Sequence, residues 1–134
     1  MTTDKFAGGQ AVRREVLGDA YVEASVTHAT EFNREFQALV TESCWGTIWT
    51  RDGLPRHTRS LLNLAMMVAL NRPHELDLHT KGALRNGVTV DEIKEVLLQA
   101  AVYCGIPAGV DAFRVASKAI AEFQAETDPA PAAP

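Results

Sequence analysis

Cysteine is scarce in this 134-residue sequence. Cys44 and Cys104 lie far apart, with no CxxC pair and no Cys/His spacing suited to zinc. This scarcity excludes a disulfide framework, a structural zinc site and thiol chemistry through a CxxC pair. We expect both cysteines to be buried thiols.

Long hydrophobic runs, basic clusters and common catalytic motifs are also missing. The longest strongly apolar stretch, residues 61–70, is interrupted by Asn63 and is too short to span a bilayer, so we expect a soluble, cytoplasmic protein with no membrane partner. The 13 Lys and Arg are outnumbered by 17 Asp and Glu and form no patch, which argues against a nucleic-acid partner. No P-loop, GxGxxG or GxSxG motif occurs. Any anionic ligand must therefore be met by a local basic pocket.

The composition that remains is that of an ordinary globular protein, with 46% hydrophobic and 22% charged residues. Two-residue alternation is absent, whereas helical spacing recurs along the chain, so we predict an all-α single-domain bundle of about six to seven helices. The domain is expected over residues 1–126. Residues 127–134 form a Pro/Ala tail that we expect to be disordered, because it has nothing to bury.

Start and stop signals place the helices. Gly18 ends the first helix and Asp19 caps the second, while Thr89 and Glu92 form a capping box and Gly105 ends the helix that it starts. The expected helices cover residues 10–17, 19–28, 30–44 followed by an aromatic segment at 45–49, 55–70, 73–86, 89–104 and 108–125.

Two of these helices have little polar surface. Apolar side chains surround nearly the whole helix at 55–70, so it must be buried on all sides, either against a second copy of the chain or as a central helix wrapped by the others. The helix at 89–104 keeps a narrow polar strip with Glu92, Glu95 and Gln99. That strip is either a solvent-facing surface or the lining of a pocket in which Glu95 is partly desolvated.

Histidine and arginine are the candidates for chemistry. His79 has apolar neighbours on its helix, so taken alone it is a core histidine bonded to a carbonyl. Arg59, on the apolar helix, needs an acceptor, which is either a protein carboxylate or a ligand carboxylate. Arg13 and Arg14 are either further anion-binding residues or part of a solvated helix face.

Several short segments follow one another in a specific order between residues 13 and 119: RREVLG at 13–18, WGTIW at 45–49, RSL at 59–61, ELDLH at 75–79, GA at 82–83, NGV at 86–88, and 95–107. In this combination the chain resembles the γ-carboxymuconolactone decarboxylase family. The resemblance implies an alkyl hydroperoxidase D-like helical protomer in a ring-like homo-hexamer, without a cofactor or metal. Hydroperoxidases of this superfamily use a CxxC pair, but this chain has Cys104-Gly-Ile-Pro107 instead, so a thiol-dependent peroxidase is disfavoured.

The family's reaction implies a small dicarboxylate lactone as substrate. In protocatechuate catabolism, within the β-ketoadipate pathway, 4-carboxymuconolactone loses CO2 to give β-ketoadipate enol-lactone. The electrons left behind flow through the C=C bond to the lactone carbonyl, so the substrate is its own electron sink. The alternative from another class is a non-catalytic helical oligomer that binds a small organic acid or a partner protein.

The resemblance raises particular residues to site candidates. Arg59 or Arg51 can hold the spectator carboxylate, and a protonated His79 can donate to the lactone oxygen and deliver the proton. Glu95 can orient His79. The remaining candidates for binding the substrate and walling the pocket are Arg13, Arg14, Trp45, Trp49 and Tyr103.

Overall fold

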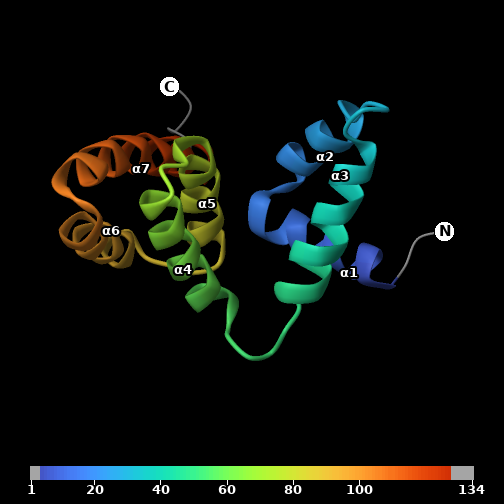
Figure 1. Ribbon diagram of the computed structural model, residues 1–134, viewed down its shortest axis with the longest axis horizontal. Coiled ribbons are helices and arrows are strands. Elements are labelled where there is room, and N and C mark those ends of the chain that lie inside the picture. The colour runs from blue at the N-terminus through green and yellow to red at the C-terminus, as the bar shows by residue number, and fades with distance from the viewer. Residues whose placement is uncertain (1–3, 128–134) are drawn as a thin grey trace, which may run out of the picture. The chain divides into compact units, whose positions relative to one another are not determined.

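The computed structural model describes residues 4–127, and every regular element in that range is helical (Figure 1). This confirms the all-α prediction. No helix among these residues is long and apolar enough to cross a membrane. The elements in chain order are α1 (Asp4–Leu17), α2 (Asp19–Thr27), α3 (Arg34–Leu39), the π-helix η1 (Val40–Ile48), α4 (Arg56–Ala69), α5 (Pro73–Arg85), α6 (Val90–Cys104) and α7 (Ile106–Thr127).

The chain gathers into two compact units, one up to Arg59 and one from Ser60 onward. The single domain expected over residues 1–126 stays a prediction. Thr127 ends α7 and so does not belong to the expected tail, and the rest of that tail, residues 128–134, lies outside the described residues.

The first unit contains α1 to η1, drawn in blue to cyan-green in Figure 1. α1 and η1 approach each other at two glycines. A Cβ added to Gly9 would lie 2.1 Å from the Thr41 carbonyl oxygen, and one added to Gly46 would lie 2.1 Å from the Lys5 carbonyl oxygen. Backbone therefore meets backbone, and only glycine permits the contact. The buried hydrophobic residues of this unit are Val12, Val16, Leu17, Val22, Trp45 and Trp49.

The second unit is built on the apolar faces of α4 to α7. In α6 the buried stripe is Ile93, Leu97 and Ala100, as its helical spacing predicts. α6 and α7 cross closely, because a Cβ added to Gly109 would lie 2.6 Å from that of Ala101. Small side chains at this crossing allow the two helices to bury the core between them.

Most helix boundaries agree with the sequence signals. Thr89 accepts a hydrogen bond from the Glu92 N–H and the Glu92 side chain accepts one from the Thr89 N–H, which completes the expected capping box. Gly18 and Gly105 have φ values of 91° and 113°, which glycine adopts readily, and they end α1 and α6. α4 and α5 begin at the expected prolines to within one residue.

Other boundaries differ from the expectation. α1 begins at Asp4 rather than at residue 10, α7 at Ile106 rather than at residue 108, and Gly18, not Asp19, is the N-cap of α2. The third helix begins at Arg34 rather than near Thr30, because residues 30–33 form a turn in which the Thr30 N–H donates to Asn33 Oδ1 at 2.8 Å. Residues 40–48 widen into a π-helix, shown by the bond from the Trp49 N–H to the Cys44 carbonyl at 3.1 Å.

Two burial predictions can be compared with the protomer. α4 is not a central helix wrapped by the others, because Leu62 and Met66 on it and Leu70 just after it are each about half exposed, and its burial against a second copy of the chain stays a prediction. Both cysteines are exposed rather than buried. Cys104 lies one turn beyond the last buried residue of α6, where Gly105 already turns the chain away from the core.

Candidate active site

His79 lies on α5, on the face that carries buried Leu76 and Ala83. Its side chain is 8% exposed. Asn63 of α4 places its amide nitrogen 3.3 Å from His79 Nδ1. An amide nitrogen can only donate, so Nδ1 accepts this bond and the proton of the neutral ring sits on Nε2.

The environment of His79 disfavours its charged form. Burial lowers the pKa of His79 below its ordinary value of 6.5, and the negative charge of Glu75, one turn earlier on α5, opposes that shift only in part. At neutral pH the imidazole of the free protein is therefore mostly neutral, and the role of a protonated His79 stays a prediction. An anionic ligand beside the ring would favour the protonated form again.

A polar seam joins α4 to α5 around His79. Asn86, at the end of α5, donates from Nδ2 to Ser60 Oγ at 2.9 Å, and Ser60 is 1% exposed. Ser60 and Asn63 are one turn apart, so α4 turns a polar edge toward this seam. These two contacts, from Asn63 to His79 and from Asn86 to Ser60, orient the polar edge of α4 toward α5. Glu75 and Asn86 are not among the site residues predicted from the sequence, although the spacing of four residues between Glu75 and His79 signals that the two share a helix face.

Arg59 lies on α4 one turn before Asn63. One terminal nitrogen, Nη2, donates to the Arg51 carbonyl at 3.4 Å. The Nε of Arg59 is buried and has no hydrogen-bond partner among the described residues. A buried guanidinium N–H without an acceptor is costly in the empty protein and is ready for a ligand oxygen.

The aromatic candidates lie in the first unit. The rings of Trp45 and Trp49 stack with centroids 4.9 Å apart, and both side chains are buried. Trp49 and the exposed Arg51 line a cavity of about 450 Å³, together with Val12 and the loop that follows η1. Of the residues expected to bind substrate, these two share a cavity.

The other candidates are more scattered. Arg14 is ion-paired with Glu23 and with Asp19, the latter at 3.6 Å, as a residue of a solvated helix face would be, and its role in substrate binding stays a prediction. Its neighbour Arg13 is instead buried, at 6% exposure. Glu95 is exposed on α6 and Tyr103 is 84% exposed, so the strip on α6 is a surface in this protomer and the catalytic or binding roles of both residues stay predictions.

Comparison with known proteins defines the class to which this fold and site belong. Residues 34–118, more than half of the chain, match the carboxymuconolactone decarboxylase family. The chain is 50% identical over 115 residues to nitrosuccinic acid decarboxylase npaB of Metarhizium robertsii, covering 86% of this chain and 80% of that protein. It is 42% identical over 114 residues to 4-carboxymuconolactone decarboxylase of Acinetobacter baylyi, covering 85% of each.

The protein therefore belongs to the carboxymuconolactone decarboxylase family. The match contains α3 to α6 and the residues of the polar seam around His79. α1, α2 and Arg13 precede it. The two relatives carry the names of different substrates, so members of this family differ in the acid that they decarboxylate.

Proposed function

We propose that the protein decarboxylates a small organic diacid that carries its own electron sink, and that 4-carboxymuconolactone is this substrate. Membership of the family and the 42% identity to a decarboxylase of that lactone support the assignment. The proposed reaction gives β-ketoadipate enol-lactone, and with it we assign the protein to protocatechuate catabolism and to the cytoplasm.

The names of the two relatives point to a shared chemistry. Each acid has two carboxylates, of which one leaves and one stays. In the lactone, the electrons of the broken C–C bond pass through the double bond to the ring carbonyl. In nitrosuccinic acid, they pass to the nitro group. The protein must then hold the remaining carboxylate, stabilise the charge on the acceptor oxygen and return a proton to carbon.

His79 is the proposed proton donor. Asn63 Nδ2 lies 3.3 Å from Nδ1, so we assign the donation to substrate to Nε2. The lowered pKa of His79 means that its imidazole is mostly unprotonated at neutral pH when no substrate is bound. A bound dicarboxylate raises that pKa, and the ring takes up a proton at Nδ1 while the Asn63 amide turns so that its oxygen accepts there. The resulting imidazolium donates from Nε2 to the charge that develops as CO2 leaves.

Arg59 is the proposed anchor for the carboxylate that stays. The observation that carries the proposal is the buried His79 held by Asn63. Arg59 precedes Asn63 by one turn in the sequence of α4, and the Nε of Arg59 has no hydrogen-bond partner among the described residues. Trp49 and Arg51 are proposed to bind substrate in their shared cavity, while Glu95, Arg14, Trp45 and Tyr103 remain weaker candidates.

The test is turnover of each acid by purified protein treated with EDTA. We expect CO2 release and loss of lactone absorbance above the spontaneous rate with 4-carboxymuconolactone. Nitrosuccinic acid is the second candidate because the relative named for it is 50% identical. Turnover of nitrosuccinic acid alone would reassign the substrate. Binding of both without turnover of either would favour the non-catalytic oligomer.

We further propose that the chain forms a homo-oligomer, a hexamer as the family resemblance implies. Support comes from apolar side chains that stay exposed in the protomer on α4, α6 and the start of α7: Met66, Leu70, Leu98, Val102 and Ile106. Such surfaces are costly in water unless they are covered. Light scattering decides the question, and a single species near the protomer mass of 14.6 kDa would refute the proposal.

A further inference from the structure

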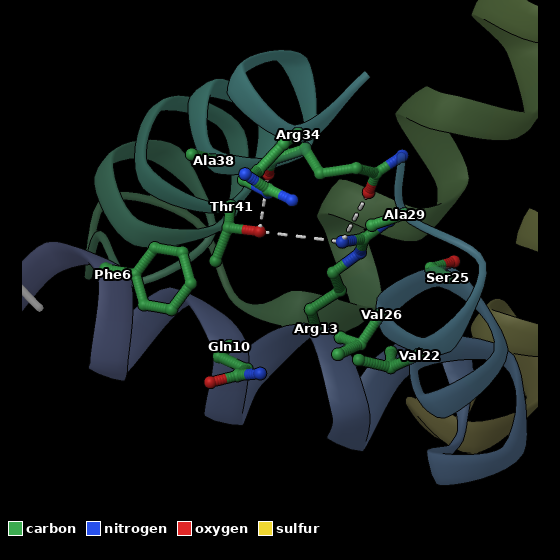
Figure 2. A pocket seen from close by; sticks show the side chains of 11 residues that line it. Phe6, Gln10, Arg13, Val22, Ser25, Val26, Ala29, Arg34, Ala38 and Thr41 are labelled. Carbon is green, nitrogen blue, oxygen red and sulfur yellow. Dashed lines mark hydrogen bonds between the residues drawn. The ribbon is translucent and has the colours of Figure 1, made fainter. Parts of the chain in front are cut away.

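A cavity of about 270 Å³ lies within the first unit, enclosed by α1, α2, α3 and the start of η1 (Figure 2). At roughly 30 Å³ per water molecule it has room for about nine waters, so it suits a molecule smaller than most drugs. Its walls are mostly apolar, with Phe6, Val22, Val26 and Ala38 among them. The other lining groups are neutral hydrogen-bonding side chains and two arginines.

Arg13 rises from α1 into this cavity (Figure 2). Although 6% exposed, its guanidinium has only neutral partners: Nη1 donates to Gln37 Oε1 at 3.2 Å and reaches Thr41 Oγ1 at 3.5 Å. Its Nε is buried without a hydrogen-bond partner among residues 4–127. The other arginine of the lining, Arg34, is exposed and ion-paired with Glu31 at 2.9 Å.

A buried charge with only neutral partners is expensive. Burial in an apolar environment strips the guanidinium of water, and a carboxylate normally compensates for that loss. No carboxylate of the described residues forms an ion pair with Arg13 or lines the cavity. The protein therefore keeps a destabilising cation beside an apolar space of molecular size, a combination typical of a ligand site.

We propose that this cavity binds a small organic acid with a single carboxylate and an apolar body. The carboxylate accepts from Nε and from a terminal nitrogen of Arg13, because the planar guanidinium matches two carboxylate oxygens. The apolar body fills the space against Phe6, Val22 and Val26. A phosphate fits poorly, because a doubly charged anion would meet one unpaired cation and an apolar wall.

The cavity lies only partly within the residues that match the family model. Its α1 and α2 walls precede residue 34, where the family match begins. Nothing in the binding requires turnover, so the site stands or falls independently of the proposed decarboxylation.

Calorimetry with benzoate as the probe tests the proposal on the full chain. Benzamide has the same shape without the charge, and inorganic phosphate has the charge without the apolar body. We expect benzoate to bind and both controls to bind at least tenfold more weakly. Arg13→Met, which keeps the length of the side chain and removes its charge, should weaken benzoate at least about thirtyfold. Arg114→Gln is the matched control, since Arg114 is exposed and paired with Asp111 on α7.

Two further variants separate binding from folding. Ala38→Leu fills the cavity without touching the charge and should abolish benzoate binding. Arg13→Met should keep or raise the Tm of the ligand-free protein, because it removes a desolvated charge and Thr41 Oγ1 still donates to the Gln37 carbonyl at 2.8 Å. A purely structural arginine would instead lower the Tm when replaced.

Cys44 offers a local readout. Partial desolvation of the thiol, in a residue that is otherwise exposed, raises the pKa of Cys44, and the charge of Arg13 opposes that shift. A carboxylate bound to Arg13 cancels that charge, so in a Cys104→Ser background benzoate should slow alkylation of Cys44. Unchanged alkylation by saturating benzoate, wild-type affinity in Arg13→Met or in Ala38→Leu, or tighter binding of phosphate than of benzoate would each overturn the proposal.

Discussion

Replacing His79 by glutamine tests the proposed proton donor most directly. Glutamine cannot supply a proton near neutral pH, so kcat should fall roughly a hundredfold to ten-thousandfold, the usual loss for a positioned general acid. KM should change little, because the carboxylate that stays is assigned to Arg59 and is held equally before and during the reaction. Steady-state kinetics with 4-carboxymuconolactone measure both constants.

The structure also fixes what this change does to stability. Glutamine can accept the bond from Asn63 Nδ2, which lies 3.3 Å from His79 Nδ1, so the free energy of unfolding should change by about 1 kcal/mol or less. His79→Leu removes the acceptor and leaves the Asn63 amide short of a partner, which costs about 1–3 kcal/mol. His74→Gln, on the exposed first turn of the same helix, is the control and should change neither kcat nor stability.

The lowered pKa of His79 gives this prediction a pH dependence. kcat/KM reports the free enzyme, in which the active imidazolium is lost as pH rises through a pKa below 6.5. As the pH rises, kcat/KM should therefore begin to fall at a pH below 6.5. The fall in kcat should begin at a higher pH, because the bound dianion raises the pKa of His79. Glu75→Gln removes a charge that favours the imidazolium, so the fall in kcat/KM should move to lower pH.

Two results would refute the reasoning. A folded and assembled His79→Gln protein with kcat within tenfold of the wild type would make His79 a core histidine, and Glu95 the next candidate donor. A fall in kcat/KM that begins well above pH 6.5 would show that another group carries the proton.

Three further predictions concern binding and stability. Arg59→Met should raise KM by the equivalent of about 2–5 kcal/mol with little change in kcat, and a wild-type KM would remove Arg59 from the site. Gly9→Ala should lower the free energy of unfolding in urea by about 1–3 kcal/mol or more, because its Cβ would overlap the Thr41 carbonyl. Gly8→Ala is the control: its Cβ would meet nothing within 4 Å, so the change should stabilise the protein by about 0.5–1 kcal/mol. Thr89→Ala should lower the free energy of unfolding by about 0.5–2 kcal/mol, measured as a lower urea midpoint at an unchanged m-value, and no change would show that the cap adds nothing.

The sequence by itself determined the helical class and most of the helix boundaries. The signals are local: proline just before or at the first residue of α4 and α5, the Thr89–Glu92 capping box, and glycine where the backbone turns to positive φ. Each acts within one turn of helix, so neighbours along the chain are enough to read it. The buried stripe of α6 followed for the same reason, because helical spacing alone assigns its face.

Only the tertiary structure decided which polar groups are buried and what they face. Arg13 and Arg14 are adjacent in the sequence, yet one is ion-paired at the surface and the other lies in a cavity, because consecutive helical residues point about 100° apart. The same holds for His79, whose neutral state depends on burial and on Asn63 from another helix. Helical periodicity assigns each side chain to a face, whereas its partner, its exposure and its pKa depend on residues brought near it by folding.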